Sequence, residues 1–441
     1  MGSGTRSIAE HRAAALARVG PVDVVEVRLD DPAATGLTLA ADVVAAAPVP
    51  AFDHAAMDGY AVRLADLPAD GTTVELAVLG DVRPGTVPEV PEVCEHGAAG
   101  TTAGEGVRGR RGAVRIMTGA PLPAGYDAVV PVERTSTGRF VAGGPTTERA
   151  VTLARQPRDH VRRAGGDLQT GTLIAKAGTR LGPGLLATAA AAGVVVVTAR
   201  RRPRVAVMST GSELADLGTT APGAVPDSNS VMLAALARAW GADVVRTGAV
   251  PDAAEALRTA LDAASGPPGP RSPTDAAAPH AVDLIVTSGG VSAGASDVVR
   301  EVLAGSDAHD VDVATVAMRP GKPQALATWH GVPWIAVPGN PVSAFVSFVL
   351  YAAPAIRRLA GEPAGSPPHD EVAAAAGWSS PAGVEQVLPV TLGPDGAVPA
   401  ATDGHHLSAL PHADALVVVP ADVTAVRPGD HLAVIRLPEP R

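Results

Sequence analysis

Three glycine-rich turns in the second half of the sequence each follow a short apolar run and precede a run typical of a helix. They are MSTGSEL (208–214), TSGGVSAGASD (287–297) and VPGNPVS (337–343). Glycine lets the backbone approach a ligand closely, and the free N–H groups at the start of a helix favour anions. In an open parallel sheet, ligands bind beyond the carboxyl ends of the strands. Each turn alone is equally typical of an ordinary connection, but together they predict a phosphate-binding site.

Carboxylates and two cations occur at the same predicted strand ends. The acids are Glu213, Asp227, Asp252 and Asp297, and the cations are Arg319 and Lys322 in RPGKP. Carboxylates beside a phosphate usually indicate a hard cation such as Mg²⁺, shared between protein and ligand. These residues therefore predict Mg²⁺-dependent phosphoryl chemistry. Asp227, in PDSNS, is at least as typical of a helix N-cap, and the two cations are equally typical of surface charges.

One of these turns also fits the G-x-S-x-G pattern of a hydrolase, with Ser292 as the nucleophile. His405, His406 or His412 would then complete the order Ser, Asp, His. Two observations weigh against this alternative. The residues SGG separate Ser292 from the strand end, whereas a nucleophile elbow turns sharply there, and the histidines belong to a separate β-rich segment.

The first half of the sequence contains two polar loops whose backbone is fixed by glycine and proline. HAAMDGYAV (54–62) contains Asp58, and RIMTGAPLPAGYDAVVPVE (115–133) contains Thr118. A polar group held rigidly in a loop can contact a substrate. Turn formation alone would also explain both segments.

The periodicity of apolar residues divides the chain into three parts. A serine and an Ala/Leu-rich run predict a helix over 7–19, which Gly20-Pro21 end. Short Val-rich strands over 21–180 predict two β-rich lobes. Apolar strands alternating with helices predict a doubly wound parallel sheet, an α/β domain built from 7–20 and 181–362, and residues 363–441 predict a small C-terminal β-barrel. Two Gly/Pro-rich insertions, 84–112 with Cys94 and 266–281, are expected to be surface excursions.

Composition excludes several classes of function. The 441 residues, at about 150 per domain, are consistent with three units. Aromatic residues make up only 2%, which argues against proteins that bind nucleic acids by stacking on bases. The net charge of -10 argues against binding to a nucleic-acid backbone or to an anionic membrane. The single cysteine predicts a reducing compartment, the cytoplasm by default. The longest near-apolar run, 185–199, is shorter than the ~20 residues of a membrane helix, and no secretory signal is expected.

Eight motifs, taken together, closely resemble a known family. In chain order they are MDGYA, IMTGAPLP, GGD at 165–167, STGSEL, DSN, SGGVSAGASD, RPGKP and PGNPVS. This set resembles the molybdopterin molybdenumtransferase family, which includes the MoeA proteins and the gephyrin E domain. The resemblance extends from about Ser7 to the C-terminus.

The resemblance implies a four-part, elongated subunit that forms a homodimer. The implied reaction is the Mg²⁺-dependent insertion of molybdate into adenylylated molybdopterin, with release of AMP. Implied partners are the molybdopterin adenylyltransferase and the downstream enzymes that modify or accept the cofactor. The implied catalytic residues are Asp58, Thr118, Asp167, Glu213, Asp252, Asp297 and Lys322, of which Asp58 and Thr118 would reach the partner's site, and Glu213, Asp252 and Asp297 would bind the metal. The implied substrate-binding residues are Ser209, Gly211, Gly289, Gly290, Ser292, Arg319, Gly339, Asn340, Ser343 and Ser408.

The sequence departs from the family pattern at three positions. Ser212 stands where the family often has an acid, Arg319 where it often has a lysine, and Pro389 where some members have a molybdate-binding arginine. An arginine keeps the charge but changes its geometry. Because relatives include anchoring proteins, a non-enzymatic scaffold is the alternative function, and the two insertions are its sequence support.

Overall fold

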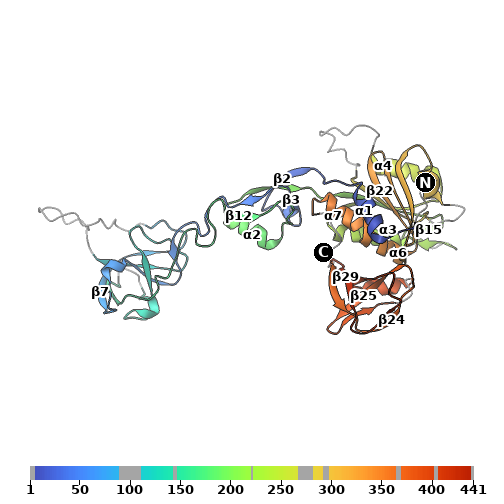
Figure 1. The fold of residues 1–441 in the computed structure, drawn as a ribbon. Coiled ribbons are helices and arrows are strands. Elements are labelled where there is room, and N and C mark those ends of the chain that lie inside the picture. The colour runs from blue at the N-terminus through green and yellow to red at the C-terminus, as the bar shows by residue number, and fades with distance from the viewer. Residues whose placement is uncertain are drawn as a thin grey trace.

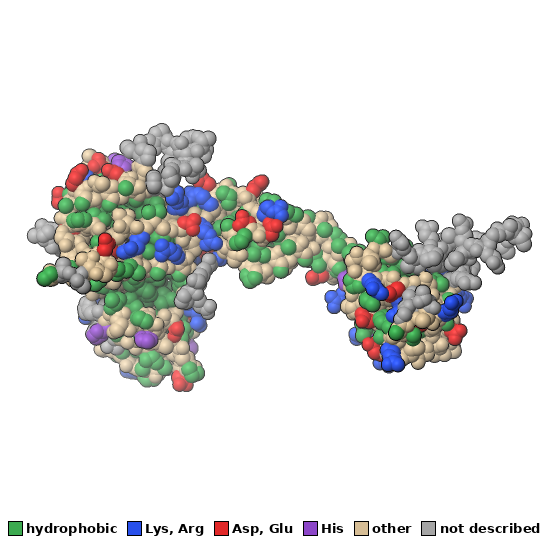
Figure 2. Space-filling view, turned by 180° about the vertical axis from the view of Figure 1, so that it is seen from behind, with side chains coloured by type: hydrophobic (Ala, Val, Ile, Leu, Met, Phe, Trp, Pro, Cys, Tyr) green, Lys and Arg blue, Asp and Glu red, His purple; other side chains and the backbone are tan. Residues whose placement is uncertain are grey.

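The computed structural model describes residues 5–88, 111–142, 147–219, 222–266, 282–291, 297–363, 369–401 and 406–438. The described chain is elongated, with two β-rich lobes in line and a larger α/β body that carries a β domain beside it (Figure 1). Figure 2 shows the same outline from behind. Most of insertion 84–112, including Cys94, and nearly all of insertion 266–281 lie outside the described residues.

The lobe at the far end, here called the distal lobe (residues 54–162), is built on a five-stranded sheet in the order β10-β7-β8-β6-β9. Its strands are β6 (Gly59–Val62), β7 (Val74–Val82), β8 (Gly112–Ile116), β9 (Ala128–Pro131) and β10 (Ala150–Leu153). Alternate residues of β6 face opposite sides, so Tyr60 and Val62 enter one core and Ala61 enters the other. Both faces of this sheet are therefore buried.

A middle lobe connects the distal lobe to the rest of the chain. Its sheet is β2 (Val24–Arg28), β13 (Val196–Arg200) and β3 (Thr38–Leu39), with helix α2 (Pro183–Ala191) and the pair β4 (Val43–Val44) and β12 (Leu173–Ala175). Residues 183–200, which the sequence analysis grouped with the α/β domain, thus pack here because β13 pairs with β2 and β3. A short pair, β5 (His54–Ala55) and β11 (Val161–Arg162), leads on to the distal lobe.

The α/β body contains a seven-stranded sheet in the order β1-β19-β21-β22-β18-β14-β17. In chain order the strands are β1 (Thr5–Arg6), β14 (Arg204–Thr210), β17 (Asp243–Val250), β18 (Leu284–Ser288), β19 (Ala308–Val316), β21 (Pro323–Trp329) and β22 (Val332–Val337). Four neighbours, β22, β18, β14 and β17, are parallel as predicted. The sheet as a whole is mixed, because β21 runs antiparallel to both β19 and β22.

Helices cover both faces of this sheet. The residues of β14 alternate, so Val205 and Val207 pack with one helix layer while Ala206 and Met208 pack with the other. The first layer contains α1 (Ile8–Leu16), α3 (Ser228–Ala239), α6 (Pro341–Ser347) and α7 (Ala353–Leu359); the second contains α4 (Ala254–Ser265) and α5 (Val298–Leu303). Helix α1 begins as predicted, because Ser7 and Glu10 form a reciprocal capping box.

The continuous helix Pro341–Leu359, formed by α6, a π-helical turn (Phe348–Ala352) and α7, has a membrane-spanning length and composition. It is the one such helix within the described ranges, and 89% of its apolar window is buried inside the protein. Burial of this extent is that of a core helix of the α/β body.

The C-terminal domain is a small curled sheet that closes on itself. Its strands are β23 (His369–Ala373), β25 (Glu385–Gly393), β26 (Gly396–Pro399), β27 (Ala415–Val419) and β29 (His431–Arg436), with the short pair β24 (Trp378–Ser379) and β28 (Ala425–Val426). A bridge between Ala374 and Ala397 joins the end of β23 to β26 and completes the ring. Strand β20 (Met318–Arg319) pairs with β25, and Val387, Leu416 and Ile435 share a core with α1 and α7. The barrel is thus packed firmly on the α/β body.

Candidate active site at the carboxyl edge of the sheet

The three glycine turns meet at one edge of the α/β sheet, here called the carboxyl edge. They follow β14, β18 and β22, which are adjacent parallel strands. A Cβ added to Gly289 would lie 2.5 Å from the carbonyl oxygen of Thr210, and one added to Gly339 would lie 3.4 Å from the Cα of Gly289. The turns after β14 and β18 therefore approach each other more closely than a side chain at Gly289 would allow, and the turn after β22 is in van der Waals contact with them.

Asn229 links these turns from the first turn of α3. Its Nδ2 donates to Ser288 Oγ (2.8 Å) and to the carbonyl oxygen of Gly339 (2.7 Å). Ser288 Oγ in turn donates to the carbonyl oxygen of Pro338 at 3.1 Å. This buried network fixes the ends of β18 and β22 relative to α3.

Several buried polar atoms at this edge make no hydrogen bond within the described part of the chain. They are Ser209 Oγ, Thr210 Oγ1, Asn229 Oδ1 and Asp297 Oδ2. An unsatisfied buried polar atom is costly, and such atoms are rare unless a ligand or water satisfies them. The edge therefore has the character of a binding site. The sequence indicated Ser209 as a site residue but not Thr210 or Asn229, although the motifs STGSEL and DSN contain them.

Glu213 and Asp252 flank the turn that follows β14. A Cβ added to Gly211 would lie 2.7 Å from Glu213 Oε1. Asp252 Oδ2 accepts from the Ser212 backbone N–H (3.2 Å), and Ser212 Oγ accepts from the Asp252 backbone N–H (3.0 Å). Ser212, where the family often has an acid, thus joins the turn after β14 to the turn after β17.

The donor groups at this edge fit Mg²⁺ only if substrate phosphates and water supply some of the ligands of the ion. The described residues contain no group of three or more His, Cys, Asp or Glu side chains placed to hold a metal. Mg²⁺ is commonly held by one or two carboxylates, substrate phosphates and water. Asp297 at the start of α5, with its buried unpartnered Oδ2, and the acids Glu213 and Asp252 match that requirement.

Arg319 and Lys322 lie at the same edge because β19 and β21 are antiparallel. The register places Thr315 opposite Pro323 and Ala325 opposite Ala336, so the segment between β19 and β21 extends beside the turn that follows β22. Buried Gln324 fastens this segment by donating to the carbonyl oxygen of Gly321 and to Ser347 Oγ, both at 2.7 Å. Arg319 and Lys322 are exposed, and across the described ranges neither side chain has an ion-pair partner.

Two helix starts at the edge are capped by residues of the predicted motifs. Asp227 is fully buried, accepts from the Ser230 backbone N–H (3.0 Å) and lies 3.7 Å from Arg246. Asp227 is therefore an N-cap of α3, one of the two interpretations that the sequence left open. Asn340 caps α6 by accepting from the backbone N–H (3.1 Å) and the hydroxyl (3.2 Å) of Ser343.

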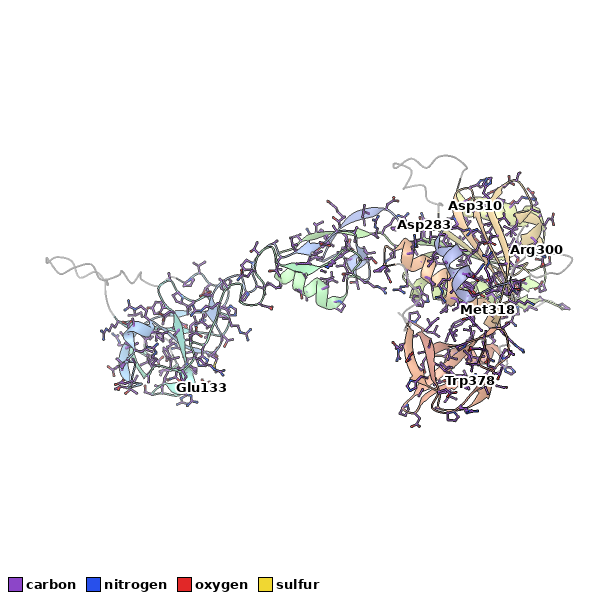
Figure 3. The ribbon with its side chains drawn as sticks, in the orientation of Figure 1. Glu133, Asp283, Arg300, Asp310, Met318 and Trp378 are labelled. Carbon is purple, nitrogen blue, oxygen red and sulfur yellow. The ribbon has the colours of Figure 1, made fainter. Side chains whose placement is uncertain are left out.

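The distal lobe holds Asp58 and Thr118 as a pair. Asp58 Oδ1 accepts from both the backbone N–H and the hydroxyl of Thr118, each at 2.8 Å. In one chain this pair lies far from the carboxyl edge: Glu133 marks the distal lobe and Met318 marks the α/β body, at opposite ends of Figure 3. Asp167 is exposed and lies between the distal and middle lobes, where its N–H donates to the carbonyl oxygen of Val49 (2.9 Å).

The C-terminal domain contributes Ser408, which is exposed on the 3₁₀ helix Leu407–His412. That helix and helices α3 and α6 line a cavity of about 460 Å³, bounded by Leu410, Met232 and Phe345 among others. The 3₁₀ helix that carries Ser408 is thus on the side of the barrel that faces the α/β body. Ser292 and His405 lie outside the described residues.

Three sequence models match the chain in order. Residues 6–193 match the MoeA N-terminal region (domain I and II), residues 206–358 match a probable molybdopterin binding domain, and residues 371–437 match the MoeA C-terminal region (domain IV).

Similar proteins cover nearly the whole chain. Molybdopterin molybdenumtransferase 2 of Mycobacterium tuberculosis is 38% identical over 439 residues, which are 97% of this chain and 99% of that protein. Molybdopterin molybdenumtransferase 1 of the same organism is 34% identical, over 90% of this chain and 91% of its own. The crystal structure of a molybdopterin biosynthesis MoeA protein from Pyrococcus horikosii is 26% identical with a TM-score of 0.75, covering 98% of this chain and 99% of that one.

The fold and these similarities define an enzyme of molybdenum cofactor biosynthesis, a transferase that acts on molybdopterin. The chain belongs to the molybdopterin molybdenumtransferase family. The family, the fold class and the enzyme class predicted from the sequence are confirmed.

Proposed function

We propose that the protein inserts molybdate into adenylylated molybdopterin and releases AMP. The observation that carries this proposal is the carboxyl edge, where three glycine turns, buried polar atoms without a partner in the described chain, and the exposed cations Arg319 and Lys322 lie together. Backbone N–H groups of the turns after β14, β18 and β22 would bind phosphate oxygens. Arg319 and Lys322 would bind the molybdate oxyanion, since charge-assisted hydrogen bonds are the stronger ones.

We also propose that Mg²⁺ takes part, held by one or two of the carboxylates Asp297, Glu213 and Asp252 together with substrate phosphates and water. When bound, the ion would neutralise charge on the phosphoanhydride of the nucleotide. The chain's own residues have separate tasks. The Asn229 network keeps the turns in register, and the glycines allow the phosphate to approach the backbone.

We propose that the protein acts as a homodimer, and the position of Asp58 and Thr118 supports this. Because these residues lie at the opposite end of the same chain from the carboxyl edge (Figure 3), they reach a site only on a second copy. We infer an isologous pair in which each distal lobe completes the partner's site. The proposed location is the cytoplasm, and the proposed partners are the adenylyltransferase that supplies the substrate and the enzymes that receive the cofactor.

The reaction is tested by incubating the protein with adenylylated molybdopterin, Mg²⁺ and molybdate and measuring AMP. Wild type is expected to release AMP, and Asp297→Asn is expected to slow release by about a hundredfold or more. Glu301→Gln is a matched control, because Glu301 is exposed on the same helix. Absence of AMP release by wild type at every molybdate concentration would reject the proposed function.

The shared site is tested by mixing two inactive variants. Asp58→Asn and Asp297→Asn each inactivate both sites of their own homodimer. A mixed dimer keeps one intact site, so random mixing should restore about a quarter of the wild-type activity. A mixture no more active than its components would contradict the shared site without affecting the proposed reaction.

A further inference from the structure

The distal lobe contains a second cavity, of about 430 Å³, that is separate from the carboxyl edge. Its lining combines apolar walls with charged and polar groups: Met57, Pro131, Glu133, Arg134, Gln156, Pro157, Arg158 and His160. A volume of this size is within the range of small-ligand sites, which typically have apolar walls and a few polar groups that fix the ligand.

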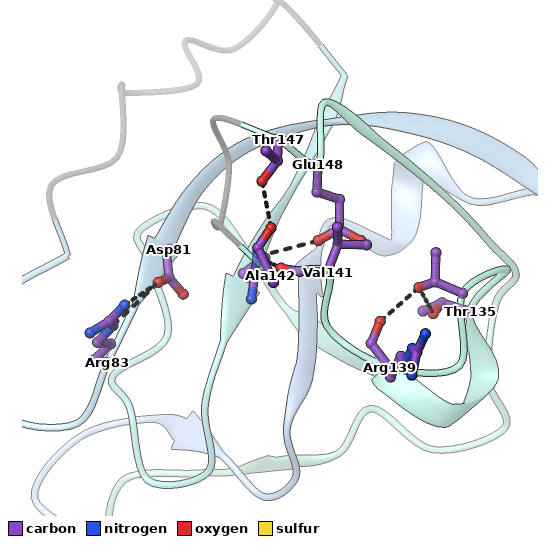
Figure 4. Close-up of polar contacts among 10 residues, drawn as sticks. Asp81, Arg83, Thr135, Arg139, Val141, Ala142, Thr147 and Glu148 are labelled. Carbon is purple, nitrogen blue, oxygen red and sulfur yellow. Dashed lines mark hydrogen bonds and ion pairs between the residues drawn. The ribbon is translucent and has the colours of Figure 1, made fainter.

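Some arginines of the distal lobe have an acidic partner among the described residues, and others have none. Arg63, Arg83 and Arg115 of this lobe each form an ion pair with a carboxylate; Figure 4 shows the contact of Arg83 with Asp81. Arg134 and Arg158 make no hydrogen bond or ion pair with the described residues. Two guanidinium groups therefore line one cavity with their donors free.

The walls of the cavity are fixed to the loop that carries Asp58. The carbonyl oxygen of His160 accepts from the Ala56 N–H at 2.9 Å, and the carbonyl oxygen of Asp58 accepts from the Val132 N–H at 3.0 Å. Pro131 and Pro157 restrict the backbone on two sides. The position of the two arginine-bearing segments is thus set before any ligand arrives, which lowers the cost of binding.

We propose that this cavity binds a tetrahedral oxyanion, either free in solution or as the phosphate of a nucleotide. A guanidinium presents a planar fork of donors that matches phosphate oxygens, and two of them can hold one anion from two sides. Glu133 also lines the cavity, so the two arginines and this glutamate together carry a net charge of +1. The net charge favours an anion, and the small size of the charge indicates a single anionic group as the ligand.

This site goes beyond the proposed function, because every group in it comes from one chain and none belongs to the carboxyl edge. Met57 of its lining immediately precedes Asp58. An oxyanion bound here would therefore lie next to the loop that carries the Asp58 and Thr118 pair.

The test is calorimetric titration of the full-length protein with orthophosphate at low ionic strength, where charge interactions are least screened. The double variant Arg134→Ala/Arg158→Ala should lose one phosphate site, with affinity there falling at least about tenfold. Arg139→Ala is the matched control, because Arg139 is exposed in the same lobe and lies outside the cavity lining; it appears at a turn in Figure 4, where its carbonyl oxygen accepts from Thr137. Lys322→Ala separates this site from binding at the carboxyl edge, since it should leave the cavity titration unchanged.

Parallel titrations with molybdate and AMP distinguish the two sources of the anion. Stronger binding of AMP than of orthophosphate assigns the site to a nucleotide phosphate, and the reverse assigns it to a free oxyanion. Equal phosphate binding by the double variant and by Arg139→Ala, with both variants folded by circular dichroism, would overturn the proposal. That result would leave AMP release untouched, so the two proposals fail independently.

Discussion

The carboxyl edge of the α/β body and the Asp58 loop of the distal lobe both hold polar groups in glycine-containing turns, but they are built differently. At the edge, Asn229, Ser288 and the carbonyl oxygens of Pro338 and Gly339 form a buried network between adjacent strands. In the distal lobe, one carboxylate oxygen of Asp58 fixes one exposed threonine. At the edge, the same contacts hold both the fold and the candidate site, so we expect one substitution to change both unfolding free energy and activity. In the distal lobe, we expect a substitution to change activity with little change in unfolding free energy.

The largest expected difference is between two glycines with positive φ. Gly289→Ala would place a Cβ 2.5 Å from the Thr210 carbonyl oxygen, whereas a Cβ at Gly119 meets nothing within 4 Å. We expect Gly289→Ala to lower the free energy of unfolding by about 3 kcal/mol or more, and Gly119→Ala by about 1 kcal/mol. Urea titration of Gly289→Ala is followed by tryptophan fluorescence, which reports the α/β body through Trp240, Trp329 and Trp334 and the C-terminal domain through Trp378. Calorimetry measures Gly119→Ala. Similar losses in both variants would break the comparison.

The next effect is that of removing the amide of Asn229. Asn229→Ala leaves Ser288 Oγ and the Gly339 carbonyl oxygen without this donor, so we expect a loss of about 2–3 kcal/mol in unfolding free energy. AMP release should fall with it, because the turns lose their common anchor. Ser228→Ala is the control, as Ser228 is exposed beside it. A stable but inactive Asn229→Ala would show that stability and chemistry are separable at the edge too.

We expect the α/β body to lose stability as the pH falls, because His11 is buried in it. Burial lowers the pKa of His11 to about 4; the ring packs against Tyr351 with centroids 4.7 Å apart. In the unfolded chain the pKa of this histidine is near 6.5. Between about pH 6.5 and 4, His11 is therefore protonated in the unfolded chain but neutral in the folded protein. Stability is therefore full above about pH 6.5 and falls as pH decreases, by about 2 kcal/mol at pH 5.

His11→Phe removes this titration while keeping an aromatic ring against Tyr351. Its unfolding free energy, followed by tryptophan fluorescence, should be less dependent on pH between 5 and 7 than that of wild type. An unchanged slope in the variant would show that another group controls the acid sensitivity of the α/β body.

The smallest expected effect on stability is in the distal lobe. Thr118→Val keeps the shape of the side chain but removes one of two donors to Asp58 Oδ1, so the unfolding free energy should change by about 1 kcal/mol or less. AMP release should nevertheless fall, because Asp58 loses a positioning contact. A stability loss as large as that of Asn229→Ala would erase the distinction between the two regions.

The periodicity of apolar residues and the glycine turns in the sequence predicted the parallel strands and the edge at which they end. The alternation of apolar strands and helices located the parallel strands β14, β17, β18 and β22, and their glycine turns indicated the shared edge. Strand direction is not encoded in periodicity, so the antiparallel course of β21 was not predicted. Residues 183–200 pack in the middle lobe through pairing with β2 and β3, a long-range contact that no local pattern reports.

Some residues of the candidate site could likewise be predicted from the sequence, and others could not. Glycines and acids at strand ends were recognisable because their types are unusual there. Asn229 was missed because an asparagine near a helix start is ordinarily a cap, and only the fold shows its Nδ2 joining two other segments. The pair Arg134 and Arg158 was also not recognisable in the sequence, because only the fold brings the two segments that carry them to one cavity.

The narrow connection between the middle and distal lobes has a mechanical consequence. Two passes of the chain cross it, and backbone hydrogen bonds between Val49 and Leu168, at 2.7 and 3.1 Å, with one from the Asp167 N–H, join them there. Because these bonds lie at the base of the distal lobe, a change in backbone angle there would displace the tip of the lobe more than its base. That backbone angle, more than any bond at the tip, would decide how closely Asp58 approaches a neighbouring molecule.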